Sequence, residues 1–196
     1  GIYGASLTAG QGTFLLGPQG AVGAVDGTLS LAAGNATATA DVTVQLNQTS
    51  SAFSSTFEQN DQLVGLSVPA GPFLRIDAQD LSINLSPALE LTGDFIMQRD
   101  ESDAGVTVGM VASNVALSLA AGPAALNVTG ADGLLLINDA GLGGRLSGTA
   151  SLDGLEGVSL LATMELELNN TGNDLPAGTL IAGTELATAI PEGLRI

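Results

Sequence analysis

Hydrophobic and polar residues alternate with a period of two along much of this chain. In ATATADVTVQLN, residues 36–47, Ala, Val and Leu fill every second position, and polar residues fill the positions between them. LATMELELNN, residues 161–170, alternates in the same way. This alternation is typical of a strand with one face in a core and one face in water. Leu, Met and Glu would also suit a helix over residues 159–170, but the counterpart at 36–47 is rich in Thr and Val, so we predict strands at both places.

Turn-forming residues interrupt the alternation about every 8–12 residues, in motifs such as GPQG, AAGN, AAGP, GADG and PEG. The chain also contains 27 glycines, which favour many turns over long helices. The spacing predicts an all-β fold with very little helix. The sequence leaves open whether this tandem β-repeat architecture is sandwich-like, a solenoid or an elongated sheet.

A stretch near the N-terminus is repeated later in the chain. Residues 7–31 align with residues 128–152 at an offset of 121, and nine of the 25 aligned pairs are identical. Four of the nine are glycines, which set backbone geometry. We expect structural or inter-repeat roles for two of these glycine pairs, Gly12 with Gly133 and Gly27 with Gly148.

The repeat divides the chain into part A (1–76), part B (77–121) and a second copy of part A (122–196). The period is about 121 residues, and FLRI (73–76) matches GLRI (193–196). A second part B is absent. We therefore expect either a longer tandem array or head-to-tail β association with other copies or adjacent repeats.

A weaker motif places glycine inside a predicted strand in VDGTLSL, LTGDFIM and LSGTASL. Glycine at such a position marks a β-bulge or a close approach of two backbones. Arg75 and Arg195 also occupy equivalent positions in the two copies of part A. We expect each arginine to pair with carboxylates and to fix a strand end or an inter-repeat contact; a weakly paired, exposed arginine is the alternative.

The net charge of the chain limits which partners it can bind. The chain has 4 basic residues, all of them Arg, against 20 acidic residues, which gives a formal net charge of −16. Such a surface repels phosphate groups, so we expect no nucleic-acid partner. No apolar stretch approaches the roughly 18 residues of a membrane span. The absence of lysine leaves trypsin-like proteases little to cut, which suits a durable secreted or cell-surface protein.

The composition argues against catalysis. Without His or Cys there is no usual pair of nucleophile and base, and without Lys there is no Ser–Lys pair. A glycosidase pair of carboxylates normally works beside aromatic platforms for the sugar, and this chain has five Phe, one Tyr and no Trp. We therefore predict a protein that is not an enzyme and requires no cofactor.

Calcium is the ligand that the acidic turns would suit best. RDESDAG brings Asp100, Glu101 and Asp103 together in one predicted loop, and NNTGND brings Asn173 and Asp174 together in another. Clustered hard oxygen atoms are what Ca²⁺ requires. Neither loop has the EF-hand spacing, so a solvated acidic turn is the alternative.

Asn-x-Ser/Thr sequons occur five times and would suggest glycans in a secreted eukaryotic protein. Several can arise by chance in a chain so rich in Thr and Ser. We take them as weak support for an extracellular location. They are Asn35, Asn47, Asn84, Asn127 and Asn169.

VPAGPFLRI, LTGDFIMQ, GLLLINDAGLGGRLSGTASL and LELNNTG resemble the tandem β-repeats of very large secreted bacterial surface proteins, which are adhesin-like. The resemblance implies a secreted, acidic, stalk-like or filament-forming protein. We predict a structural repeat module of an extracellular stalk, adhesin or filament.

Two other functions stay open from the sequence. One is a β module that binds Ca²⁺, a carbohydrate such as a glycan, or a lipid. The other is an ice-binding protein with a row of Thr37, Thr39 and Thr43, although Glu165 and Glu167 interrupt that row in the second copy.

Overall fold

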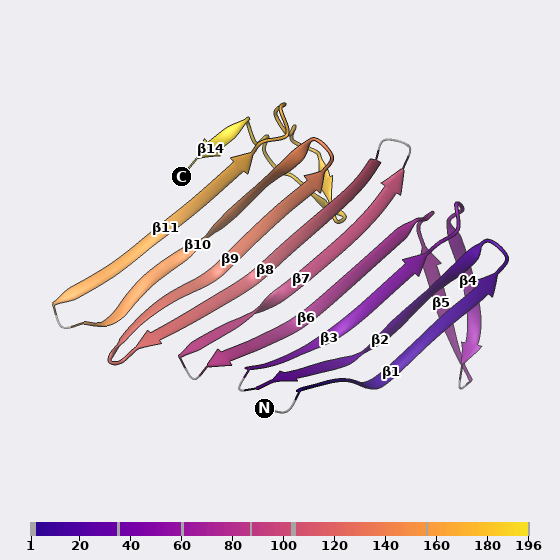
Figure 1. The fold of residues 1–196 in the computed structure, drawn as a ribbon, viewed down its shortest axis with the longest axis horizontal. Coiled ribbons are helices and arrows are strands. Elements are labelled where there is room, and N and C mark those ends of the chain that lie inside the picture. Colours follow the sequence, from indigo (N-terminus) through magenta and orange to yellow (C-terminus); the bar gives the residue numbers. More distant parts are fainter. Residues whose placement is uncertain are drawn as a thin grey trace.

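The computed structural model is one long antiparallel sheet, and the predicted all-β fold is confirmed. The structure describes residues 3–34, 36–59, 61–86, 88–102, 105–155 and 157–195. This part of the chain contains no helix, and so no helix that is long and apolar enough to cross a membrane. The sheet has ten strands and stays open (Figure 1). Of the forms that the sequence left open, the fold is an elongated sheet.

Each strand of the sheet pairs with the next strand of the sheet along the chain. Two insertions interrupt this order. The first, residues 48–72, carries the hairpin β4 (Phe53–Gln59) and β5 (Gln62–Val68), and the second, residues 170–192, carries the short β12 (Leu180–Ile181) and β13 (Thr184–Glu185). The sheet strands are β1 (Tyr3–Gly17), β2 (Gly20–Ala33), β3 (Ala36–Asn47), β6 (Phe73–Ser86), β7 (Leu89–Ser102), β8 (Gly105–Ala121), β9 (Ala124–Asn138), β10 (Gly141–Leu155), β11 (Val158–Asn169) and β14 (Gly193–Arg195).

The sequence repeat coincides with a repeat of strands. β1, β2 and β3 correspond to β9, β10 and β11, and each set is followed by an insertion and then by the strand that contains the LRI motif, β6 or β14. β7 and β8, from part B, lie between the two sets in the sheet (Figure 1). One period of the sequence is therefore six strands of the sheet.

Bulges recur near the middle of the strands. Gly27, Gly93 and Gly148 each lie opposite two residues of a neighbouring strand, so the bulges predicted from their motif are confirmed. The extra residue of the bulge opposite Gly93 is Asn114, whose φ is +54°. A Cβ atom on Gly93 would lie 3.0 Å from the Cα of Val115. Glycine is needed there because the backbones approach too closely for a side chain.

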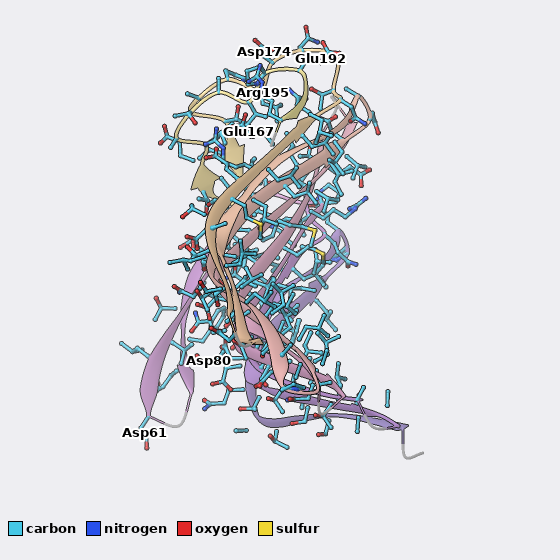
Figure 2. All side chains as sticks on the ribbon, turned by 90° about the vertical axis from the view of Figure 1, so that its left-hand side faces the viewer. Asp61, Asp80, Glu167, Asp174, Glu192 and Arg195 are labelled. Carbon is cyan, nitrogen blue, oxygen red and sulfur yellow. The ribbon has the colours of Figure 1, made fainter. Side chains whose placement is uncertain are left out.

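The two faces of the sheet differ in chemistry. On the polar face, Thr43 of β3 lies opposite Asp26 of β2. On the apolar face, Val44 lies opposite Val25, as the alternation predicts. Both insertions lie on the polar face, and Figure 2 shows them on the same side of the sheet, with Asp61 at the turn of the β4–β5 hairpin.

The apolar face is largely open to solvent. Leu31 is 41% exposed, Met110 38% and Leu166 40%. The expectation that the apolar side of each strand is buried is therefore wrong for much of this face. The alternation identifies which side should leave water, but it does not say whether the same chain supplies a cover.

The buried clusters lie instead beneath the two insertions, on the polar face. Under the first insertion, Leu66 and Val68 of β5 pack with Val22 and Phe73 of the sheet. The second cluster consists of residues of the second insertion around Leu136 of β9: Leu175, Ile181, Leu186 and Ile190. Each insertion therefore covers the few apolar side chains that its end of the polar face presents.

An asparagine at equivalent positions of the repeat, Asn47 or Asn169, anchors each insertion. Asn169, 1% exposed, donates from Nδ2 to the carbonyls of Asn173 (2.9 Å) and Ile190 (2.8 Å). Its Oδ1 accepts from the backbone amide and the hydroxyl of Thr171, at 3.1 and 2.8 Å. Asn47 makes the equivalent set with Ser51, Pro69 and Thr49. Two of the predicted glycan sequons are therefore buried loop anchors, and the sequon threonine belongs to the anchor.

Replacement of Asn169 by Ala should destabilise the chain by about 2–4 kcal/mol, because it removes the hydrogen bonds to the carbonyls of Asn173 and Ile190 and leaves the amide of Thr171 without its partner. The exposed Thr163 lies on the same strand and face. The control variant Thr163→Ala should cost no more than about 0.5 kcal/mol. Urea unfolding at a fixed protein concentration measures both values, and equal costs would contradict the anchor role.

Candidate functional site

Arg75 connects the first copy of part A to the insertion of the second. From β6 its Nη1 donates to the carbonyl of Ala182 at 2.9 Å and to Oε1 of Gln98 at 3.1 Å. Its Nη2 lies 3.5 Å from Asp77. Ala182 is 107 residues further along the chain. This half-buried arginine therefore joins the two copies of the repeat.

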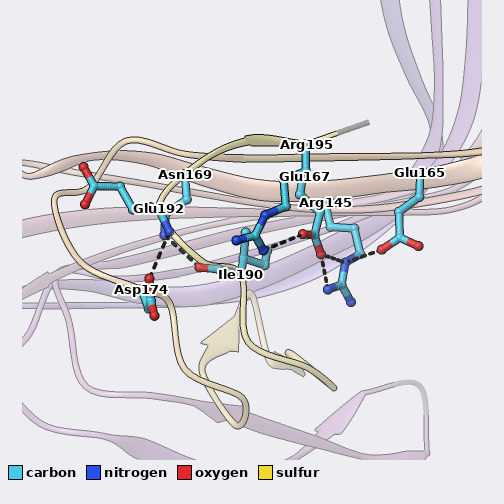
Figure 3. Close-up of polar contacts among 8 residues, drawn as sticks. All are labelled: Arg145, Glu165, Glu167, Asn169, Asp174, Ile190, Glu192 and Arg195. Atoms are coloured by element: carbon cyan, nitrogen blue, oxygen red, sulfur yellow. Dashed lines mark hydrogen bonds and ion pairs between the residues drawn. The ribbon is translucent and has the colours of Figure 1, made fainter.

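Arg195, the equivalent of Arg75, takes part in an ionic row across β10, β11 and β14. Glu167 of β11 lies between two arginines: Arg145 donates to its Oε1, and Arg195 lies 3.7 Å from its Oε2 (Figure 3). Arg145 also lies 3.0 Å from Glu165. The side chain of Glu167 is 13% exposed, whereas that of Arg195 is 54% exposed. The arginine at the end of the sheet is thus paired but open to solvent.

The structure separates the first group of residues predicted to bind calcium. Asp100 and Glu101 are strand residues of β7, not residues of one loop, and Asp103 lies outside the described residues. Asp100 points to the polar face and accepts from Gln98 at 2.8 Å, whereas Glu101 points to the apolar face and pairs with Arg99 at 2.7 Å. Successive strand residues point to opposite faces, so these two carboxylates do not converge.

The second group lies in the second insertion. The carbonyl of Asn173 accepts from Asn169. Figure 3 shows the second contact, in which Oδ1 of Asp174 accepts from the amide of Glu192 at 3.0 Å. Both residues therefore hold the loop closed. Over the described residues, no group of three or more carboxylates is placed to hold a metal ion. Calcium binding stays a prediction.

Two carboxylates of the polar face support bulges. Asp94 accepts from the amide of Asp80 at 3.0 Å, and Asp132 accepts from the amide of Asn114 at 3.2 Å. The hydrogen bond from the Asp80 backbone, followed by that from the Asn114 side chain, holds the pKa of Asp94 below its ordinary value of 3.8. Asp80 and Asn114 both have positive φ, so each carboxylate holds a bulge at its irregular residue.

The two glycine pairs predicted to have structural roles lie on the apolar face. A Cβ on Gly12 would lie 3.1 Å from the Cβ of Val25, and one on Gly133 would lie 3.2 Å from Leu146. Val25 and Leu146 are the cross-strand partners of these glycines. Gly27 and Gly148 lie on the same face opposite bulges. The large side chain of one strand therefore lies over the glycine of the next.

The two ends of the sheet are the candidate functional site, because their equivalents inside the sheet are paired. β1 corresponds to β9, which pairs with β8, but in the described structure β1 pairs only with β2. Leu16 of β1 is 85% exposed, whereas its equivalent Ile137 of β9 is 38% exposed. β14 corresponds to the start of β6, which pairs with β7, but among the described residues β14 pairs only with β11. Both edges direct backbone donors and acceptors outwards.

Sequence reasoning expected open edges but did not find the two asparagine anchors or the carboxylates that hold bulges. The sequence did contain an indication of the anchors. In the match of VTVQLNQT to MELELNNT, Asn and Thr recur at the same spacing in both copies. Comparison of the chain with family models, with curated proteins and with solved structures finds no match.

Removal of the Asp94 carboxylate should change how stability depends on pH. The folded pKa of Asp94 lies below the unfolded value, so its stabilisation is complete above the ordinary pKa of 3.8 and disappears as the pH falls through the folded pKa. Asp94→Asn should therefore be less stable than the parent near neutral pH, by no more than about 1 kcal/mol at this partly exposed position. The difference should close once the pH lies below the lowered folded pKa of Asp94.

Denaturant unfolding at several pH values measures this difference. The control is Asp153→Asn. Asp153 is an exposed carboxylate of the polar face that accepts hydrogen bonds from side chains and from no backbone amide of a bulge. A difference for Asp94→Asn that grows on acidification would contradict the assignment.

Proposed function

We propose that this chain is a non-enzymatic structural repeat module of an extracellular stalk, adhesin or filament, which is extended through its two open β edges. The observation that carries the proposal is that each open edge repeats an edge already occupied inside the same sheet. β9 accepts β8 and β6 accepts β7. A strand of the β8 type therefore suits the edge of β1, and a strand of the β7 type suits the edge of β14.

The side chains along these edges support the same pairing. In the β8–β9 ladder, Met110 lies opposite Leu135 and Ala112 lies opposite Gly133. The corresponding positions of β1 hold Phe14, which is 52% exposed, and Gly12. A strand like β8 would place its apolar side chains against the exposed side chains of β1 and restore the ladder hydrogen bonds.

The composition supports a location outside the cell. The chain has no lysine and a net charge of −16, which favour resistance to trypsin-like proteases and solubility of a long array. The resemblance of its repeat motifs to those of large secreted bacterial surface proteins points the same way. In a tandem array each repeat covers the edge of its neighbour, so the terminal repeats alone stay open.

Extension by one repeat should lengthen the particle by a fixed step. In a chain of residues 1–196 followed directly by a second copy of residues 77–196, six strands are added. At about 4.8 Å per strand, the maximum dimension should grow by roughly 29 Å. Small-angle X-ray scattering measures this change, and thermal unfolding should remain a single transition at a raised midpoint.

The matched control keeps the added length and composition but shuffles the order of the added residues 77–121. This control should gain mass without the ordered increase in length. Two sheets that tumble independently, or a thermal midpoint no higher than that of the 196-residue chain, would contradict extension through the edges.

A further inference from the structure

The apolar face is large enough to form a stable interface by itself. Its nine long strands have lengths between 12 residues, in β3, and 17, in β8. Eight strand spacings of about 4.8 Å and strands of about 40 Å give roughly 1,500 Å². A stable protein interface needs about 800 Å² from each partner. The exposed side chains on this face include Leu7, Leu31, Met110, Leu119, Leu146 and Leu166.

This face offers a partner almost no polar group. The backbone donors and acceptors are used by the strand ladders, and those directed outwards lie at the edges. Among the described residues, the charged side chains on the face are Arg99 and Glu101, which pair with each other at 2.7 Å. A carbohydrate or an extended peptide would lose its hydrogen bonds to water there without replacement. The occupant must therefore be apolar itself.

The distribution of charge favours a second sheet over a lipid surface as the occupant of the apolar face. The acidic side chains of the strands, such as Asp26, Asp94, Asp132 and Glu167, lie on the polar face. Their negative field repels phosphate headgroups. A second sheet of this kind would keep its own charges on its far side. The two charged faces would then be separated by more than one Debye length, about 8 Å at physiological salt.

The shape of the apolar face, with large side chains beside glycines, also suits packing against a second sheet. Large side chains lie over the glycines of neighbouring strands, as Leu146 does over Gly133. This arrangement lowers the face locally and leaves a shallow hollow of about 320 Å³ around Gly133 and Gly144, lined by Phe95, Met110, Leu135 and Leu166. Such relief between aliphatic side chains allows two twisted sheets to interdigitate about 10 Å apart.

We propose that two copies of this chain stack their apolar faces to form a β-sandwich dimer. The contact has twofold symmetry, because the same face is used by both copies. It is separate from the strand edges, so it neither requires nor prevents extension through them. Both insertions lie on the polar face of each sheet (Figure 2), so in the sandwich the two polar faces would point outwards on opposite sides.

The mass of the particle in solution tests this proposal. Light scattering after size exclusion should give twice the 19.4 kDa of one chain. Met110→Glu combined with Leu166→Glu should weaken the dimer at least about 100-fold, because it would bury unpaired charges. Leu161, which lies on the polar face of the same strand as Leu166, is 78% exposed. The control Leu161→Glu should leave the dissociation constant within about threefold.

Single cysteines provide a second measurement, because the chain has no native cysteine. Ala162 and Thr163 are adjacent and exposed on β11, with Ala162 on the apolar face and Thr163 on the polar face. In Ala162→Cys the dimer should slow the reaction with a water-soluble thiol reagent by at least about tenfold relative to Thr163→Cys. Adding the two glutamate substitutions should abolish this protection.

Three results would overturn the proposal. The first is a monomer at concentrations up to about 100 µM. The second is association that the Met110→Glu, Leu166→Glu variant retains at the same strength, which would assign it to the edges. The third is a monomer that binds phosphatidylcholine vesicles and loses this binding in the Met110→Glu, Leu166→Glu variant, which would assign the face to lipid.

Discussion

The hydrogen-bond ladder between neighbouring antiparallel strands holds this molecule together. The two buried clusters are small and lie under the insertions, so they fix loops at one end of the strands and do not organise the sheet. A sheet built in this way has two consequences. It satisfies every interior strand on both sides, and it leaves two edges and two faces whose chemistry decides what the molecule can contact.

The features that depend on local sequence could be predicted. Alternation at 36–47 and 161–170 gave strands with the correct faces. The turn spacing of 8–12 residues was too short for the long strands, which have 12 to 17 residues, because a motif such as GADG lies at a bulge inside β9 and not at a turn. The motif glycines Gly27, Gly93 and Gly148 marked bulges because a bulge brings backbone within reach of the residue opposite. These properties involve a strand and its nearest neighbour, so a single sequence contains the information.

Features that depend on residues distant in the sequence could not be predicted. Asn47 and Asn169 read as glycan acceptors, because nothing local shows that an insertion will return and bury them with its own carbonyls. Asp100 and Glu101 were predicted to form one ligand cluster, because a run of acidic residues is typical of a turn. β7 continues through this run to Ser102, so the two side chains point to opposite faces. The contact of Arg75 with Ala182 spans 107 residues, beyond what any local motif can indicate.

The order of the strands has a consequence for how the chain acquires its structure. Apart from the two insertions, each strand of the sheet pairs with the strand that directly precedes or follows it. Contacts between sequence neighbours close short loops, which favours rapid formation. A chain that becomes available from its N-terminus can add one strand at a time to the growing edge, so the unfinished sheet at each stage has the same architecture as the finished one. The loop that must close to add a strand therefore does not grow with the number of strands. A longer chain of this kind meets no larger topological barrier to folding than a shorter one.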